Sequence, residues 1–201
     1  MVDGCLAILG CSNRKRQFKG PREAIEVYDG HFYRVIRKAR RLGYCPPDLD
    51  ILIVSAKFGL IKETTLIEWY ELPMSWNRAA VWRDKVSADL DQFLEGKDYR
   101  SILVAMGQLY RLAISNSTFL QNGIDEGLVV GTWERIVFHS VQMKSWLIEQ
   151  HAVSTNGDRI ATDTDRGRLV TLHSARPLRT IVQMAAARQA RGSNYDKQAL
   201  R

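Results

Sequence analysis

The chain has 201 residues, 45% of them hydrophobic and 25% charged, a composition typical of a globular protein with one substantial core. Its 29 Lys and Arg residues outnumber its 22 Asp and Glu residues, and the formal net charge of +7 favours a polyanionic partner such as a nucleic acid. No apolar run approaches the roughly 20 residues that cross a bilayer, and the first residues lack a signal-peptide pattern, so we exclude a membrane partner and expect a cytoplasmic location.

Three apolar runs predict strands that helices cover on both faces, at residues 5–11, 50–55 and 101–106. Between the first two runs, apolar side chains recur at helical spacing from Phe32 to Leu42, and Gly43 provides a C-terminal stop. Before the third run, Ser75 can cap a helix that ends near Gly96. This order predicts right-handed crossovers and an α/β fold with a mostly parallel sheet flanked by helices.

The second half of the chain has a less regular pattern. We predict a short helix at 108–115, a strand at 135–141, a helix at 144–150, and loops or short strands around Gly123, Gly127 and Gly131. Further on, the pattern predicts a loop at 154–167, a strand at 168–172, and a helix that starts at Pro177 and leads into a basic tail. We therefore divide the chain into an α/β core over residues 1–150 and a basic segment of loop, strand, helix and tail over residues 151–201.

Two small, polar, basic segments follow predicted strands and mark the candidate site. They are Cys11-Ser12-Asn13-Arg14-Lys15 after the first strand and Ser55-Ala56-Lys57-Phe58-Gly59 after the second. Because the carboxyl ends of parallel strands share one edge of a sheet, we expect the two segments to meet there and form a ligand crevice. Gly59 would let the backbone approach a ligand, and Ser55 and Lys57 would bind a polar or anionic group. Neither segment matches a Walker loop or a dinucleotide fingerprint.

Cys11 has the best case for reactivity among the cysteines, because Arg14 and Lys15 nearby would favour its thiolate. The alternative is a small, inert side chain that fills the strand end. The odd set of Cys5, Cys11 and Cys45 argues against a disulfide framework, and its spacing matches no common zinc site. The histidines have no partner at a metal-binding spacing, so we expect neither a metal ion nor a cofactor.

Aromatic and acidic residues supply further candidates for the site. Tyr28 and Tyr70 could stack on bases, and Glu68 could act as a general acid or base. Trp69, between them, is interpreted as a packing residue.

Basic residues are clustered along the chain, and the helix over residues 32–42 has a cationic face without alternating acids. This favours contact with nucleic-acid phosphates, and a merely solvated face is the alternative. The residues predicted to contact the nucleic-acid backbone are Arg14, Arg34, Arg37, Lys38, Arg41, Arg179, Arg188 and Arg191.

Several short motifs follow one another along the first half of the chain: Cys11-Ser12 with Lys15, Tyr28-x-Gly30, Ser55-Ala56-Lys57-Phe58-Gly59-Leu60, Ile67-Glu68-x-Tyr70, and Gly107 with Tyr110. The series resembles the YaaA-like (DUF328 and DUF6884) group over residues up to about 110. The resemblance implies a small α/β protein linked to nucleic acid, since some relatives are similar to DNA-binding stress proteins and others accompany base-modification systems. It also suggests a DpdC-like branch, which converts a nitrile on 7-deazaguanine in DNA to an amide.

These observations lead to three hypotheses. The first is a DNA base-modification enzyme of the nitrile hydratase (lyase) type, in which a Cys11 thiolate adds to a nitrile carbon on a (deaza)purine and Glu68 protonates the nitrogen. The second is a non-catalytic DNA-binding protein of the stress-response type that grips an unpaired or modified base. The third is a small-molecule enzyme, such as a nucleobase or nucleotide hydrolase. RNA in place of DNA, and the oligomeric state, stay open.

Under the first hypothesis, the residues fall into two groups. The catalytic group is Cys11, Glu68 and Lys57. The substrate-binding group is Ser12, Lys15, Tyr28, Ser55, Gly59, Tyr70, Gly107 and Tyr110.

Overall fold

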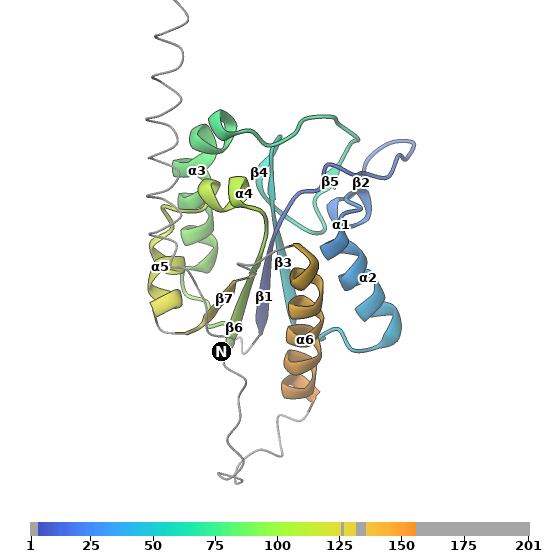
Figure 1. The fold of residues 1–201 in the computed structure, drawn as a ribbon, viewed down its shortest axis with the longest axis vertical. Helices are drawn as coiled ribbons and strands as arrows, with labels where there is room; N and C mark the ends of the chain where they lie inside the picture. Colours follow the sequence, from blue (N-terminus) through green and yellow to red (C-terminus); the bar gives the residue numbers. More distant parts are fainter. Residues whose placement is uncertain (1–3, 126, 132–135, 156–201) are drawn as a thin grey trace, which may run out of the picture.

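A five-stranded sheet in the order β4-β3-β1-β6-β7 forms the centre of the computed structural model, which describes residues 4–125, 127–131 and 136–155 (Figure 1). Strands β1, β3, β6 and β7 run parallel, whereas β4 runs antiparallel to β3. The predicted α/β fold with a mostly parallel sheet is therefore confirmed. The strands are β1 (Cys5–Gly10), β3 (Leu49–Ser55), β4 (Gly59–Lys62), β6 (Ser101–Ala105) and β7 (Val129–Gly131).

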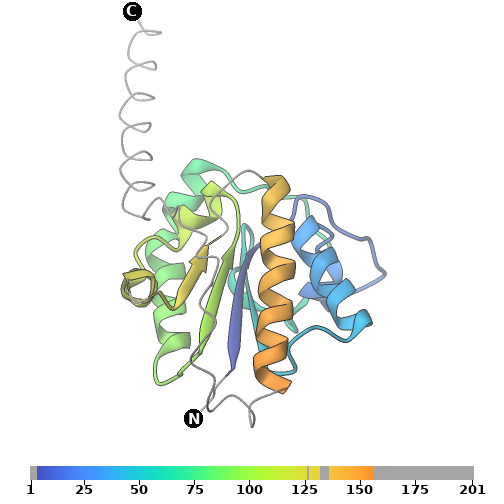
Figure 2. The same cartoon turned by 60° about the horizontal axis from the view of Figure 1, so that its bottom comes forward.

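Helices cover both faces of the sheet, which explains why the central strands are unbroken apolar runs. Helices α2 (His31–Leu42) and α6 (Ile136–Thr155) pack on one face, and α3 (Trp76–Leu94), α4 (Gln108–Ala113) and α5 (Thr118–Asp125) lie on the other (Figure 1, Figure 2). Every residue of β1 and β6 is buried between these layers. The core thus consists of the sheet and the inward faces of the helices.

The predicted helix boundaries follow from local capping. Helix α2 ends at Gly43, which has a φ of 74° and takes the left-handed conformation that glycine adopts most readily. Helix α3 begins after Ser75, whose side chain accepts a hydrogen bond from the N–H of Arg78 at 3.3 Å. Both ends agree with the sequence predictions.

A second, two-stranded sheet was not predicted. Its strands β2 (Arg22–Glu23) and β5 (Leu66–Ile67) pair antiparallel beside the short helix α1 (Ala24–Val27). An isolated antiparallel β-bridge also pairs Lys15, in the segment after β1, with Tyr28, just before α2. These pairings hold the segment after β1 against the segment before α2, and they thereby shape the candidate site.

The prediction of a strand at 135–141 is wrong, because residues 136–155 form the single helix α6. Alternation of side-chain type over residues 135–141 suggested a strand, but Met143, Trp146 and Leu147 lie at helical spacing and are buried. Packing against the sheet therefore overrides the local preference. The helix also carries the chain past residue 150 to Thr155, into the first residues of the predicted loop.

Gly123 lies inside helix α5 rather than in a loop. A Cβ atom at this position would lie 2.8 Å from Cγ2 of Val129, so glycine allows the helix to approach β7 closely. The rest of the 154–167 loop, the 168–172 strand and the helix from Pro177, with Arg179, Arg188 and Arg191, lie outside the described residues. Among the described residues, no helix has the length and apolar composition that a bilayer crossing requires.

Candidate functional site

The candidate site lies where the chain changes direction across the sheet. The connection after β1 leads to α2 on one face, and the connection after its neighbour β6 leads to α4 on the other. Neighbouring parallel strands with diverging connections leave a crevice at their carboxyl ends, where ligands of open α/β sheets bind. The structure has a pocket of about 130 Å³ there, lined by Gly10, Cys11, Ser12, Gly30, His31, Phe32, Tyr33, Met106, Gly107 and Tyr110.

Cys11 and Tyr110 form the polar contact at the base of this pocket. The Cys11 Sγ lies 3.1 Å from the Tyr110 hydroxyl, and only 6% of Cys11 is exposed. Gly10 makes this approach possible, because a Cβ atom there would lie 2.9 Å from Cγ of the Tyr110 ring. Burial raises the pKa of Tyr110, and a negative charge on the neighbouring sulfur would act in the same direction. The phenol is therefore protonated at neutral pH and can donate to sulfur.

Two further contacts shape the pocket wall. The Tyr33 hydroxyl of α2 donates to the carbonyl of Gly10 at 3.0 Å, which ties the helix to the end of β1. Ser12 packs against the residue before α2, since a Cβ atom on Gly30 would lie 2.9 Å from the Ser12 Oγ. The amino end of α2, where the helix dipole is positive, consequently faces the pocket.

Three buried hydroxyl groups lie at the end of β3, and we call Tyr28, Ser55 and Tyr70 the hydroxyl triad. The Tyr28 hydroxyl donates to the Ser55 Oγ at 3.2 Å, and the Tyr70 hydroxyl lies 2.9 Å from Ser55 and 2.6 Å from Tyr28. Burial raises the pKa of both phenols, so they stay neutral. With Tyr28 0% and Tyr70 6% exposed, the rings have no open face for a base, and the stacking role predicted for them does not fit the structure.

Two lysines approach the ring of Tyr70. The Nζ of Lys15 lies 4.4 Å from the ring centroid, and the Nζ of Lys57 lies 5.4 Å from it. Burial lowers the pKa of Lys15, whereas the charges of Cys11 and Glu71 act in the opposite direction. Lys57 is exposed and is not among the residues that line the pocket. The two ammonium groups therefore place positive charge beside the hydroxyl triad, and neither lysine is among the residues that line the pocket.

Seven predicted catalytic or substrate-binding residues are not among those that line the pocket: Lys15, Tyr28, Ser55, Lys57, Gly59, Glu68 and Tyr70. Glu68 is exposed and has no hydrogen-bond or ion-pair partner among the described residues. Gly59, with a φ of 72°, forms the β3–β4 turn, where a Cβ atom would lie 3.1 Å from the ring of Trp82. Trp69, interpreted as a packing residue, is 44% exposed, so that interpretation is wrong. The geometry favours Tyr110 over Glu68 as the proton donor to a group at Cys11.

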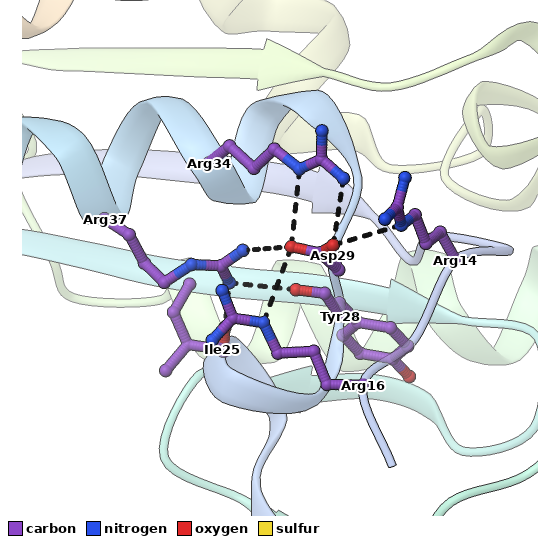
Figure 3. Close-up of polar contacts among 7 residues, drawn as sticks. All are labelled: Arg14, Arg16, Ile25, Tyr28, Asp29, Arg34 and Arg37. Atoms are coloured by element: carbon purple, nitrogen blue, oxygen red, sulfur yellow. Dashed lines mark hydrogen bonds and ion pairs between the residues drawn. The ribbon is translucent and has the colours of Figure 1, made fainter.

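The sequence shows Asp29 only as a carboxylate next to Tyr28, and its role as the centre of an arginine cluster was not predicted. Its carboxylate is surrounded by guanidinium groups, and we call these residues the Asp29 cluster: Asp29, Arg14, Arg16, Arg34 and Arg37 (Figure 3). The hydrogen bond from Arg34 holds the pKa of Asp29 below its usual value. The sequence signal for this cluster was the position of Asp29 just before helix α2, whose charged residues are all bases.

The cluster changes the interpretation of the basic residues on α2. Arg34 and Arg37 bind Asp29, and so does Arg14 from the segment after β1, rather than forming an unpaired cationic face. Lys38 and Arg41 are exposed on α2 outside the cluster. Among the residues that the structure describes, no group of three or more His, Cys, Asp or Glu side chains could hold a metal ion.

Comparison with known proteins adds one finding. No curated protein matches the chain in sequence. A family model described as a family of unknown function (DUF6884) matches residues 6–125, which is more than half of the chain and includes the pocket, the hydroxyl triad and the Asp29 cluster. The chain therefore belongs to the DUF6884 family.

Proposed function

We propose that the protein is a cysteine-dependent enzyme that converts a nitrile on a (deaza)purine base of DNA to an amide, as 7-cyano-7-deazaguanine would require. The observation that carries the proposal is the contact of 3.1 Å between Cys11 Sγ and the Tyr110 hydroxyl inside the pocket. A nucleophile beside a protonated acid is the pair that addition to a nitrile needs.

The reaction can be written with these two side chains and water. The Cys11 sulfur bonds to the nitrile carbon while Tyr110 donates its proton to the nitrogen and accepts the thiol proton, which gives a thioimidate. Water then adds to the same carbon, and the C–S bond breaks to release the amide and restore the thiol. The substrate gains one water molecule, and no oxidant or reductant is required.

The size and position of the pocket are compatible with a single base. A volume of about 130 Å³ is smaller than the ~300–1,000 Å³ typical of sites for drug-sized ligands. A base inside a duplex would have to rotate out of the stack to enter it. The ammonium groups of Lys15 and Lys57, which lie beside the Tyr70 ring, are suited to binding phosphates next to such a base.

The alternative is a non-catalytic protein that binds an unpaired or modified base in DNA. The excess of positive charge in the Asp29 cluster favours both functions equally, because this charge would strengthen DNA binding whether or not a reaction follows. The two functions differ in what Cys11 contributes: rate in the enzyme, and only packing in the binding protein.

The test incubates purified protein with duplex DNA containing 7-cyano-7-deazaguanine and measures by mass spectrometry whether the base gains one water. We expect conversion by the wild type, loss of it in Cys11→Ala, and a decrease of about 10²–10⁴-fold in Tyr110→Phe. Cys45→Ala is the matched control, because Cys45 lies beyond the C-terminus of α2, away from the pocket. Unchanged conversion in Cys11→Ala would refute the covalent mechanism, and DNA binding without conversion would favour the alternative.

A further inference from the structure

We propose that the Asp29 cluster is a binding site for one phosphate group, assembled in advance by Asp29 at the edge of the pocket. Four guanidinium groups lie within 3.6 Å of one carboxylate, so four positive charges face a single negative charge. Elsewhere on the same helix, Arg40 pairs with Glu63 one to one, at 2.8 Å. The cluster thus has an excess of three positive charges that an anion would compensate.

The repulsion within the cluster is visible in Arg37. Burial lowers the pKa of Arg37, and the charges of Arg16 and Arg34 lower it further, whereas Asp29 acts against them. Like charges held this close destabilise the folded protein unless a counter-ion joins them. A doubly charged phosphate would remove most of that repulsion, and binding therefore gains free energy beyond its direct hydrogen bonds.

The cluster is also rigid before any ligand arrives. Arg37 donates through Nη1 to the carbonyls of Ile25 and Tyr28, at 2.9 and 3.0 Å, and through Nη2 to Asp29 at 2.6 Å. Arg34 contacts both carboxylate oxygens of Asp29, at 3.4 and 2.9 Å. Preorganised donors lose little conformational entropy when a ligand binds, which raises the affinity.

The backbone fixes the remaining members of the cluster. The N–H of Asp29 donates to the carbonyl of Arg14 at 2.8 Å, and the N–H of Arg16 donates to the carbonyl of Val27 at 2.8 Å. These two bonds run between the segment after β1 and the segment before α2. The main chains that carry Arg14, Arg16 and Asp29 are therefore held side by side.

The outer edges of the guanidinium groups are open to solvent. The side chains of Arg14, Arg34 and Arg16 are 72%, 51% and 48% exposed, although each contacts Asp29 with an edge (Figure 3). A guanidinium group has five N–H donors arranged as a planar fork, which matches two oxygens of a phosphate. Asp29 binds the N–H groups of the guanidinium edges that face it, and the N–H groups on the solvent-facing edges can bind the phosphate.

The position of the cluster connects it to the pocket. Asp29 directly precedes Gly30, which lines the pocket and is the N-cap residue of helix α2. Resting on the proposed function, this proximity identifies the substrate class as a base that carries its phosphate, a nucleotide or a nucleic-acid strand, rather than a free base or nucleoside.

The experiment measures phosphate affinity independently of catalysis, by titrating inorganic phosphate at constant ionic strength and following calorimetric heat and thermal unfolding. We expect saturable 1:1 binding by the wild type and an affinity lower by about 10-fold or more in Arg14→Gln and in Arg34→Lys, since each loses charged hydrogen bonds. Arg40→Gln is the matched control and should bind as the wild type does. Phosphate stabilises folded proteins generally by exclusion from their surface, so the difference between variants is the measured effect.

Two further titrations distinguish the source of the phosphate. A nucleoside 5′-monophosphate that binds at least as tightly as inorganic phosphate, with the same sensitivity to Arg14→Gln, would support a nucleotide. Tighter binding of an oligonucleotide would support a strand. Equal phosphate affinity of wild type, Arg14→Gln and Arg34→Lys would overturn the site. If the wild-type protein bound phosphate as expected but did not convert the nitrile, the proposed function would be refuted and the phosphate site would still be supported.

Discussion

Replacing Ser55 with alanine tests the hydroxyl triad, because the Ser55 Oγ joins both phenols to the β3–β4 turn. It contacts the hydroxyl groups of Tyr28 and Tyr70, at 3.2 and 2.9 Å, and accepts from the N–H groups of Lys57 and Phe58, each at 3.2 Å. Alanine removes all four contacts at a position that is 0% exposed, whereas the phenols keep their mutual bond of 2.6 Å. A buried group left without its partner costs about 1–3 kcal/mol. Since the four contacts share one atom and are not additive, we expect the free energy of unfolding to fall by about 2–4 kcal/mol.

Urea unfolding followed by circular dichroism measures this change by linear extrapolation. Ser87→Ala is the matched control, because Ser87 is also buried and its Oγ accepts one N–H, that of Asn116, at 3.1 Å. We expect this control to lose about 1 kcal/mol. If Ser55→Ala were no more destabilising than Ser87→Ala, the hydroxyl triad would not be the stabilising junction that the structure indicates.

Three other substitutions test the glycines and the carboxylate of the site. Gly10→Ala places a Cβ atom 2.9 Å from the Tyr110 ring, so we expect the free energy of unfolding in urea to fall by about 1–3 kcal/mol and nitrile conversion by Cys11 and Tyr110 to become slower. The hydrogen bond from Arg34 lowers the pKa of Asp29 below 3.8, so the ionised carboxylate stabilises the folded protein above that pH and loses this effect as the pH falls through the pKa of the folded state. The difference in free energy of unfolding between wild type and Asp29→Asn, measured in urea from pH 6 to pH 2.5, should therefore shrink below about pH 4. A difference that stays constant would contradict the ion pairs. Gly59→Ala should cost about 1 kcal/mol or more, because a residue with a φ of 72° beside an indole ring is strained by any side chain; a thermal shift within error of zero would refute this.

Much of the fold could be predicted because its signals are local. The runs at 5–11, 50–55 and 101–106 became β1, β3 and β6, and helical spacing with a terminal glycine defined α2. Helix α6 was predicted only in part, since a short alternating pattern at its start was interpreted as a strand, and only residues 144–150 were predicted to be helical. Strand β5 is only two residues long, and such a strand exists because β2 lies beside it.

The candidate site was predictable in outline and not in detail. The rule that strand ends meet at one edge predicted a crevice between the segments after β1 and β3. The pocket is instead lined by Cys11 and Ser12 after β1 and by Gly107 and Tyr110 after β6, and Ser55 is not among its lining residues. The rule does not say which acid reaches the thiol. Glu68 was the prediction from residue type, whereas the structure places the Tyr110 hydroxyl at Cys11.

Local patterns along the chain were enough to specify the central strands β1, β3 and β6, helices α2 and α3 with their caps, and the basic character of α2, because these depend on residues only a few positions apart. The tertiary structure decided the contact of Cys11 with Tyr110, which are 99 residues apart, and the gathering of residues from two segments around Asp29. Such contacts depend on which strands are neighbours and on how the connecting segments pack. No periodicity or spacing within a segment carries that information, and the chemistry of the site therefore emerges only when the sheet is assembled.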